Sequence, residues 1–93
     1  MMYSLGFTKN AAKILQKMER NVSQKIFRAL QEIKTNPHSH IEPLIRPKGA
    51  EPLYKLRVGM YRVIIAMRND VMVILVVDVG PRKTIYKKYG GKG

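Results

Sequence analysis

The stretch that decides the fold is Leu53-Tyr54-Lys55-Leu56-Arg57-Val58-Gly59-Met60-Tyr61-Arg62-Val63-Ile64. Successive side chains of a strand point to opposite faces, so the apolar residues at every second position from 54 to 58 share one face. Lys55 and Arg57 then point to the other face. Gly59-Met60 predicts a hairpin turn, because glycine adopts positive φ without strain. Residues 61–67 are rich in β-branched residues and predict the returning strand.

The sheet is expected to continue on the C-terminal side of this hairpin. Arg68-Asn69-Asp70 predicts a second turn. The segment Val71 to Val79 is nearly all apolar, which is typical of a central strand covered on both faces. Gly80-Pro81 ends that strand, and Thr84-Ile85-Tyr86 predicts a short last strand.

On the N-terminal side, Met2 to Phe7 predicts a first strand and Thr8 the N-cap of a helix. Apolar residues follow at helical spacing: Ala11, Ile14, Leu15 and Met18. Asn21 is expected to cap a second helix, which ends near Thr35 because Pro37 disfavours helical backbone at the residue before it. Two helices with so short a link predict an antiparallel hairpin.

The predicted fold class is therefore α+β. An N-terminal strand and an antiparallel two-helix hairpin precede a three- to four-stranded antiparallel meander in one twisted sheet, with the helices on one face. The chain has 93 residues, enough for one compact domain. We expect that domain over residues 1–88 and a flexible basic tail over 89–93.

Charge is the strongest compositional signal. Eighteen Lys and Arg against six Asp and Glu give a formal net charge of +12. Such a charge favours polyanionic partners: nucleic acid first, an acidic protein second, an anionic membrane surface third. The absence of cysteine excludes disulfides, a thiol nucleophile and cysteine–zinc sites. The longest apolar run, Val71 to Val77, is too short to span a bilayer, and no signal peptide is visible, so a cytoplasmic protein is expected.

Four cations are predicted to meet near one end of the sheet. Lys55 and Arg57 share a face, Arg62 enters the next strand within cross-strand reach, and Arg82 follows the break after the central strand. Like charges placed opposite each other destabilise a sheet, and no acidic residue occurs between Glu51 and Asp70. This pattern indicates a bound anion. A solvated basic face explains it equally well, and both interpretations stay open.

Other chemistries find less support. His38 and His40, with Glu42 nearby, lie in a proline-rich surface loop and do not form the fixed scaffold that a zinc site needs. No catalytic carboxylate pair or serine–histidine arrangement is apparent, and no cofactor or metal is expected. Tyr86 follows Arg82 by four residues, and its ring could stack on a nucleic-acid base. Further basic residues are candidates for contacts with RNA: Arg46, Lys48, Lys83 and Lys87.

The sequence resembles the RelE/ParE superfamily of toxins from bacterial and archaeal toxin–antitoxin pairs. The likeness rests on residues 53–59, 61–64 and 77–82, together with Tyr86 and the order of the elements, and it covers about residues 3–86. The resemblance is to the RelE-type mRNA interferases in particular. It implies a metal-independent endoribonuclease that cuts mRNA in the ribosomal A site, where the 2′-hydroxyl attacks the neighbouring phosphate.

The resemblance also implies a role for each candidate residue. Lys55 and Arg57 match two basic residues that handle the attacking hydroxyl, and Arg62 matches an arginine that holds phosphate. Arg82 matches the arginine assigned to leaving-group protonation or transition-state charge, and Tyr86 the tyrosine that orients the base. One position departs from the well-known ribonucleases, which have lysine where this chain has Arg57. Arginine does not deprotonate in proteins, so Lys55 is the candidate base.

The resemblance further implies an acidic RelB-like antitoxin, with the ribosome and mRNA as targets, no membrane, and a toxin–antitoxin heterotetramer as one possible assembly. Two alternatives remain. A ParE-like toxin would bind DNA gyrase without hydrolysis, but the five candidate residues have a use only with RNA. A non-enzymatic nucleic-acid-binding module would need the basic face but not Tyr86.

Overall fold

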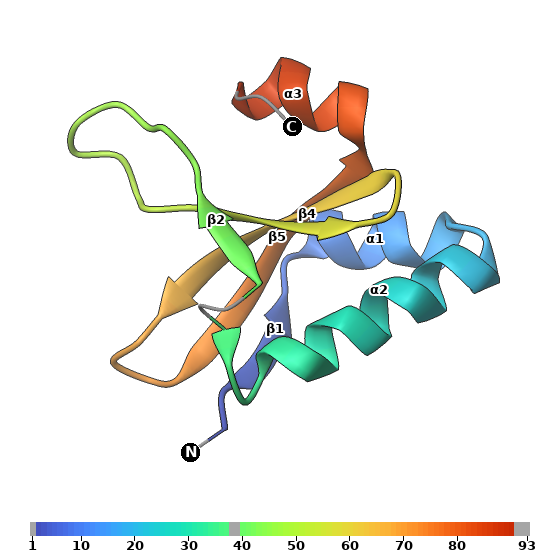
Figure 1. Cartoon of the computed structure of the whole chain (residues 1–93), viewed down its shortest axis with the longest axis horizontal. Coiled ribbons are helices and arrows are strands. Elements are labelled where there is room, and N and C mark those ends of the chain that lie inside the picture. Colours follow the sequence, from blue (N-terminus) through green and yellow to red (C-terminus); the bar gives the residue numbers. More distant parts are fainter. Residues whose placement is uncertain (1, 38–39, 91–93) are drawn as a thin grey trace.

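A computed structural model describes residues 2–37 and 40–90 of the chain. Five strands form one sheet in the order β1-β5-β4-β3-β2, and three helices pack on it (Figure 1). The elements are β1 (Ser4–Phe7), α1 (Lys9–Lys17), α2 (Arg20–Ile33), β2 (Ile41–Pro43), β3 (Tyr54–Val58), β4 (Tyr61–Arg68), β5 (Val73–Pro81) and α3 (Arg82–Tyr89).

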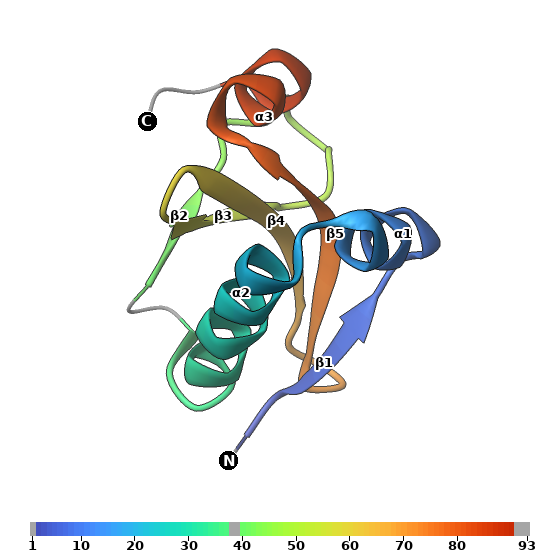
Figure 2. The same cartoon turned by 90° about the vertical axis from the view of Figure 1, so that its right-hand side faces the viewer.

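The predicted α+β fold is confirmed. Strands β2 to β5 form the antiparallel meander, and β1 joins its far edge parallel to β5. Helices α1 and α2 lie on one face of the sheet, and α3 follows the end of β5 (Figure 2). Ile85 packs α3 against the opposite face. The main core lies between the buried faces of α1 and α2 and the face of the sheet that they cover. The largest fully buried members of that core include Ile26, Leu30 and Ile65.

Local signals explain the start of each helix. Thr8 caps α1 as predicted, because its hydroxyl accepts a hydrogen bond from the Ala11 N–H at 3.1 Å. Asn21 does not cap α2. That helix begins one residue earlier, at Arg20, with Glu19 at the N-cap and no side-chain capping bond. Helix α2 ends at Ile33, close to the predicted end.

The predicted last strand at Thr84-Ile85-Tyr86 is wrong, since these residues lie within α3. Pro81 ends the strand ladder because it lacks an N–H, and its φ of −60° suits the position before a helix. Ile85 is buried against a second apolar cluster on the other face of the sheet. Its packing outweighs the weak β-propensity of the segment.

The C-terminal boundary also differs from expectation. The predicted domain ends at residue 88, but Tyr89 still belongs to α3, and Gly90, with φ of 73°, takes the cap position. Residues 91–93 of the expected tail lie outside the described residues. One short strand, β2, was not predicted; it lies within the segment interpreted as a loop and pairs with β3.

Strand β5 contains a β-bulge at Val77. Ile64 pairs with Asp78 and Ile65 pairs with Val76, so Val77 has no partner in β4. The extra residue changes the alternation of the strand. Val76 and Val79 face the main core, whereas Asp78 shares with its partner Ile64 the face that carries α3.

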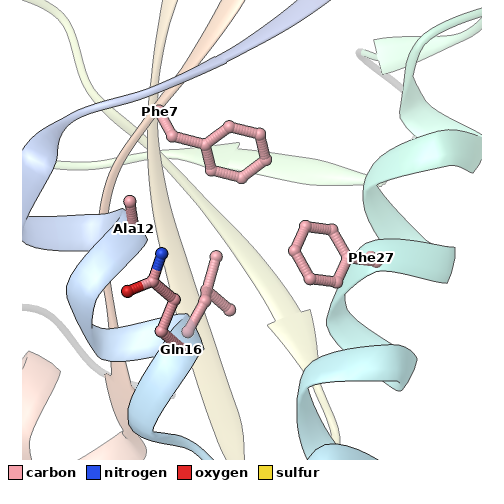
Figure 3. A pocket seen from close by; sticks show the side chains of 5 residues that line it. Phe7, Ala12, Gln16 and Phe27 are labelled. Atoms are coloured by element: carbon pink, nitrogen blue, oxygen red, sulfur yellow. The ribbon is translucent and has the colours of Figure 1, made fainter.

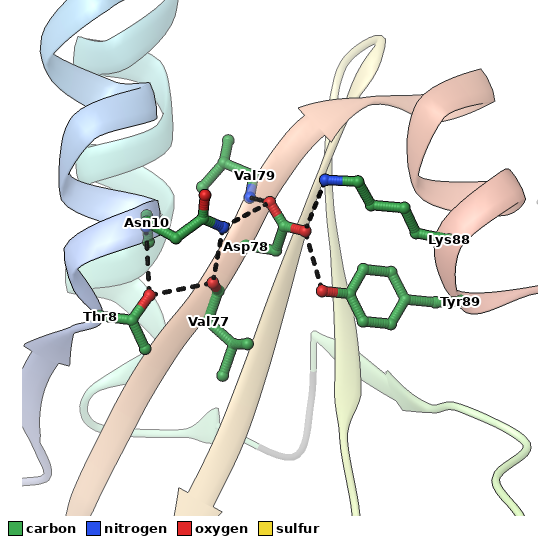
Figure 4. Close-up of polar contacts among 8 residues, drawn as sticks. Thr8, Asn10, Val77, Asp78, Val79, Lys88 and Tyr89 are labelled. Atoms are coloured by element: carbon green, nitrogen blue, oxygen red, sulfur yellow. Dashed lines mark hydrogen bonds and ion pairs between the residues drawn. The ribbon is translucent and has the colours of Figure 1, made fainter.

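The bulge is held by the start of α1. The Thr8 hydroxyl donates to the Val77 carbonyl at 3.0 Å, and the Thr8 N–H donates to the Val76 carbonyl at 3.0 Å. Asn10 reaches Asp78, with 3.3 Å between its Nδ2 and the carboxylate Oδ1 (Figure 4). The carbonyl that the bulge removes from the ladder therefore keeps a partner, as buried backbone groups require.

Asp78 joins α3 to the sheet. Its carboxylate is 2% exposed and accepts hydrogen bonds from the Tyr89 hydroxyl at 2.8 Å and from the Val79 N–H at 2.9 Å. The Lys88 ammonium lies 3.4 Å from the same carboxylate. Burial and the hydrogen bond to Asp78 raise the pKa of Tyr89 to about 12.

Core packing on α2 yields one prediction. Leu30 is fully buried in the main core, whereas Val73 is half-buried at the start of β5. Leu30→Ala should lower the free energy of unfolding by about 2–5 kcal/mol through lost burial and the cavity left behind. The control, Val73→Ala, should cost about 1 kcal/mol or less. Urea denaturation measures both, and equal losses would contradict this assignment of the core.

The raised pKa of Tyr89 yields a second prediction. The phenol titrates near 10 in the unfolded chain and near 12 in the fold, so its contribution to stability is complete below pH 10 and lost as pH rises to 12. Tyr89→Phe should therefore be less stable than the wild type at neutral pH, and the difference should narrow between pH 10 and 12. Chemical denaturation across that range measures it, and a difference independent of pH would contradict the assignment.

Candidate functional site

Three of the predicted site residues meet around the ring of Tyr86. The Arg82 Nε donates a hydrogen bond of 3.0 Å to the Tyr86 hydroxyl, and the Arg82 guanidinium carbon lies 5.3 Å from the ring centroid. The Lys55 ammonium lies 6.0 Å from the same centroid. Both distances suit cation–π attraction. The ring is therefore in contact with cations from β3 and α3, two elements far apart in the sequence.

Lys55 is buried, although the sequence analysis placed it on a solvated face. Its side chain is 8% exposed because the segment before β3 and helix α3 cover this face of the sheet. Glu42, its register partner in β2, brings a carboxylate oxygen to 3.7 Å from the ammonium. No acidic residue occurs between Glu51 and Asp70, but β2 brings one to Lys55 from outside that stretch. The Glu42 side chain is 76% exposed, so this ion pair is weakened by solvent and open to competition from another anion.

Arg57 and Arg62 are register partners across β3 and β4, as the hairpin predicted. Arg57 is exposed, but Arg62 is only 2% exposed and does not lie on a solvated face. Its Nη1 donates to the carbonyls of Gly59 and Tyr61, both at 2.9 Å. Arg62 thus stabilises the β3–β4 turn. Removing it would take away the donor to both turn carbonyls, so an Arg62→Ala variant tests folding as well as activity.

A hollow of about 460 Å³ lies between the β3–β4 turn and the start of α3. Its lining consists of Met60, Pro81, Arg82, Lys83 and Tyr86. The turn and the helix are joined here by a hydrogen bond of 3.0 Å from the Arg82 N–H to the Met60 carbonyl. Two cations and an aromatic ring around one hollow can bind a phosphate together with a base, because the cations attract the backbone and the ring offers a stacking surface.

The remaining basic candidates divide into two groups. Lys83 lines the hollow, and Lys87 lies exposed on the same helix. Arg46 instead lies beside the end of α3, where its charge acts on the Tyr89 phenol, and Lys48 is exposed in the segment between β2 and β3. The structure therefore brings Lys83 to Arg82 and Tyr86, and does not bring Arg46 or Lys48 to the hollow.

Three residues near the site were not predicted. Met60 was interpreted only as part of a turn, yet it lines the hollow. Glu42 reaches Lys55 only because β2 pairs with β3, and no pattern in the sequence marks that strand. Asp78 was read as one residue of an apolar strand, although a lone carboxylate in such a run is a signal for a buried polar contact.

A second hollow, of about 260 Å³, lies between β1, α1 and α2. Its lining is apolar apart from Gln16, and Phe7 and Phe27 face each other across it with ring centroids 5.9 Å apart (Figure 3). No cation lines it, so it does not suit a phosphate. Arg82 and Lys83 line the other hollow.

Metal ligands do not gather in the described part of the chain. Residues 2–37 and 40–90 contain no group of three or more histidine, cysteine or acidic side chains placed to hold a metal ion. His38, one of the residues considered for zinc, lies outside this part of the chain. None of the described helices is both long enough and apolar enough to cross a membrane.

Comparisons with known proteins agree on one family. The family described as "ParE toxin of type II toxin-antitoxin system, parDE" matches residues 5–86. A protein of Escherichia coli described as a RelE-like toxin is 29% identical over 85 residues, which cover 89% of this chain and 86% of that protein.

Solved structures show the same fold. A mutant of the Escherichia coli toxin RelE in the free state is 26% identical, covers 96% of this chain and 95% of its own, and superposes with a TM-score of 0.71. The RelBE2 toxin–antitoxin complex of Mycobacterium tuberculosis contains a chain that is 20% identical, with a TM-score of 0.76, covering 88% of this chain and all of that one. On the match across residues 5–86, this chain belongs to the ParE toxin family of type II toxin–antitoxin systems, within the RelE/ParE superfamily.

Proposed function

We propose that this toxin is a ribosome-dependent mRNA endoribonuclease that acts in the cytoplasm and inhibits translation. The observation that carries the proposal is that Lys55 and Arg82 both lie near the ring of Tyr86, beside a hollow that Lys83 also lines. The site combines two cations with one aromatic ring. An enzyme that must hold a base and neutralise a phosphate uses both.

The proposed reaction is an attack within the RNA strand. The 2′-hydroxyl loses its proton, its oxygen forms a bond to the neighbouring phosphorus, and the bond from phosphorus to the 5′-oxygen breaks. The leaving 5′-oxygen takes a proton from solvent, so the products are a 2′,3′-cyclic phosphate and a 5′-hydroxyl. Lys55 is the candidate base, in its neutral form, because Arg57 cannot deprotonate. Metal ions have no part in this proposal.

Arg82 is assigned to the charge that develops on the phosphate. A guanidinium does not give up its proton, so stabilising negative charge suits it better than protonating the leaving oxygen. Its hydrogen bond to the Tyr86 hydroxyl fixes its position before substrate arrives. Such preorganisation lets the cation act without rearranging in the transition state.

Tyr86 is assigned to the base next to the scissile bond. Its ring is half-buried, and Lys55 and Arg82 lie near it. An incoming base therefore stacks on the part of the ring that remains exposed. Stacking on an aromatic side chain contributes about 1–3 kcal/mol per base in proteins that bind single strands. Arg57 is exposed on the same face of the sheet as Lys55, and Lys83 lines the hollow; both are assigned to the flanking phosphates.

An acidic RelB-like antitoxin is the proposed partner. The relative from Mycobacterium tuberculosis was solved as a toxin–antitoxin complex. A net charge of +12 favours rapid association with an acidic segment at low salt. Such a segment competes with RNA for the same exposed cations, which silences the toxin.

The family match also supports a second candidate function. ParE-type toxins act on DNA gyrase by binding, and the family that matches this chain bears that name. The two functions are separated by assaying the purified toxin in parallel for mRNA cleavage on ribosomes and for inhibition of supercoiling by gyrase. Cleavage without gyrase inhibition supports the proposal, and the reverse result overturns it.

The charge on Arg82 provides the sharpest test of the site. Arg82→Ala should lower the rate of ribosome-dependent mRNA cleavage by about 10²-fold or more, the usual cost of losing a transition-state donor. The matched control is Arg68→Ala, which removes an arginine bound to Glu51 in an exposed ion pair at the other end of β4. The control should cleave at the wild-type rate. Wild-type cleavage by Arg82→Ala would remove Arg82 from the site.

Salt dependence tests the contact with RNA. If four cations each neutralise one phosphate, the logarithm of the association constant for single-stranded RNA should fall with the logarithm of the salt concentration, with a slope of about −3. Replacing exposed Arg57 by alanine should reduce the magnitude of that slope by about 0.7, because one phosphate contact is lost. Binding of a labelled RNA across a salt series measures both values. A slope near zero for the free toxin would contradict an electrostatic RNA site.

A further inference from the structure

Helix α3 carries Arg82 and Tyr86, yet few contacts of its own hold it in place. It has eight residues, and Ile85 is its one fully buried residue. A helix of this length is unstable in isolation. Its first turn is fixed by the chain leaving β5 and by the hydrogen bond from Arg82 to the Met60 carbonyl. The position of its last turn must be set by another contact.

That contact is the buried carboxylate of Asp78. Figure 4 shows it between the start of α1 and the end of α3. One oxygen accepts from the Val79 N–H at 2.9 Å and from Asn10 at 3.3 Å, which fixes the carboxylate to the sheet and to α1. The other oxygen accepts from the Tyr89 hydroxyl at 2.8 Å and lies 3.4 Å from the Lys88 ammonium.

We propose that Asp78 is a positioning residue, which holds the last turn of α3 through Tyr89 and so sets the angle at which Tyr86 faces Lys55 and Arg82. Tyr86 and Tyr89 are three residues apart and therefore lie on adjacent turns of one helix face. A change in the tilt of α3 moves the Tyr86 ring, because the helix is pinned at its first turn. Asp78 itself does not line the hollow.

Three features support this role. Asp78 is 2% exposed, and a buried carboxylate costs free energy unless its oxygens are bonded, so its contacts with Tyr89 and Val79 offset that cost. The bulge at Val77 is what turns Asp78 toward α3. The Tyr89 hydroxyl keeps its proton throughout the physiological range and remains a donor to Asp78.

The main test removes the donor alone. Tyr89→Phe deletes the hydroxyl and keeps the ring that packs against the second apolar cluster. The matched control is Tyr3→Phe, which removes an exposed hydroxyl bonded to Asn69 at 2.9 Å, far from α3. Asp78→Ala removes the acceptor, and Asp78→Asn restores an acceptor of the same shape without the charge.

The first measurement does not depend on the proposed function. Hydrogen exchange of the α3 amides should accelerate by about five- to tenfold in Tyr89→Phe, the effect of losing one hydrogen bond. NMR contacts between the Tyr86 ring and the Lys55 side chain should weaken, while exchange in β4 stays as in the wild type. Asp78→Ala should do the same or more, and Asp78→Asn should lie between Ala and wild type. Unchanged α3 exchange and unchanged Tyr86 contacts in Tyr89→Phe would overturn the proposal, even if Asp78→Ala fails to fold.

The second measurement rests on the proposed function. On ribosomes, Tyr89→Phe should lower kcat by about tenfold with KM nearly unchanged, since misplacing an orienting group costs alignment of the reacting atoms. Tyr3→Phe should match the wild type. A positioning role would be overturned if kcat fell in proportion to the free energy of unfolding in Tyr89→Phe and in the Tyr3→Phe control alike. If the wild-type toxin does not cleave RNA, the proposed function fails, and the exchange and NMR results still decide the role of Asp78.

Discussion

The pairing of β4 with β5 across the bulge at Val77 is the constraint on which the rest of the structure depends. Before the bulge, alternate β5 residues such as Ile74 and Val76 face the helices α1 and α2. At the bulge the alternation shifts by one, so Val79 joins the same core while Asp78 turns toward α3. One extra residue therefore lets β5 pack against α1 and α2 on one face and bind α3 on the other. Without it, the carboxylate would enter an apolar core, which costs free energy that no neighbour there could offset.

The cations of the site are held by the fold in unequal ways. Arg62 is buried and bonded to turn carbonyls, so part of its charge supports the hairpin. Lys55 is covered, but its ion pair with Glu42 opens to solvent. Arg82 is exposed and positioned by Tyr86. Their mutual repulsion is thus reduced by backbone oxygens, a carboxylate and an aromatic ring. An anionic substrate adds to this arrangement and is not required to hold it together.

Membership of the RelE/ParE superfamily establishes the fold of this chain. The target of the toxin depends instead on the side chains of its site. The same sheet and helices occur in the toxin chain of the Mycobacterium tuberculosis complex at only 20% identity. The hairpin turn, the start of α3 and the end of β5 meet in one place, around the hollow lined by Met60, Pro81 and Arg82. Helix α3 is held by the burial of Ile85, by the packing of the Tyr89 ring and by the Asp78 carboxylate.

The sequence by itself determined the main core and the β3–β4 hairpin. Alternation across residues 54–58 and helical spacing of apolar residues are local patterns, and they identified β3, α1 and α2 correctly. Only the tertiary structure decided the rest. Residues 84–86 favour a strand locally, but burial of Ile85 against the sheet makes them helical. The alternation of residues along the strands predicts that Lys55 and Arg62 are solvated, yet the fold buries both. Glu42 and Asp78 reach their partners only through strand pairing and a bulge, because burial and register depend on contacts between segments that no local pattern records.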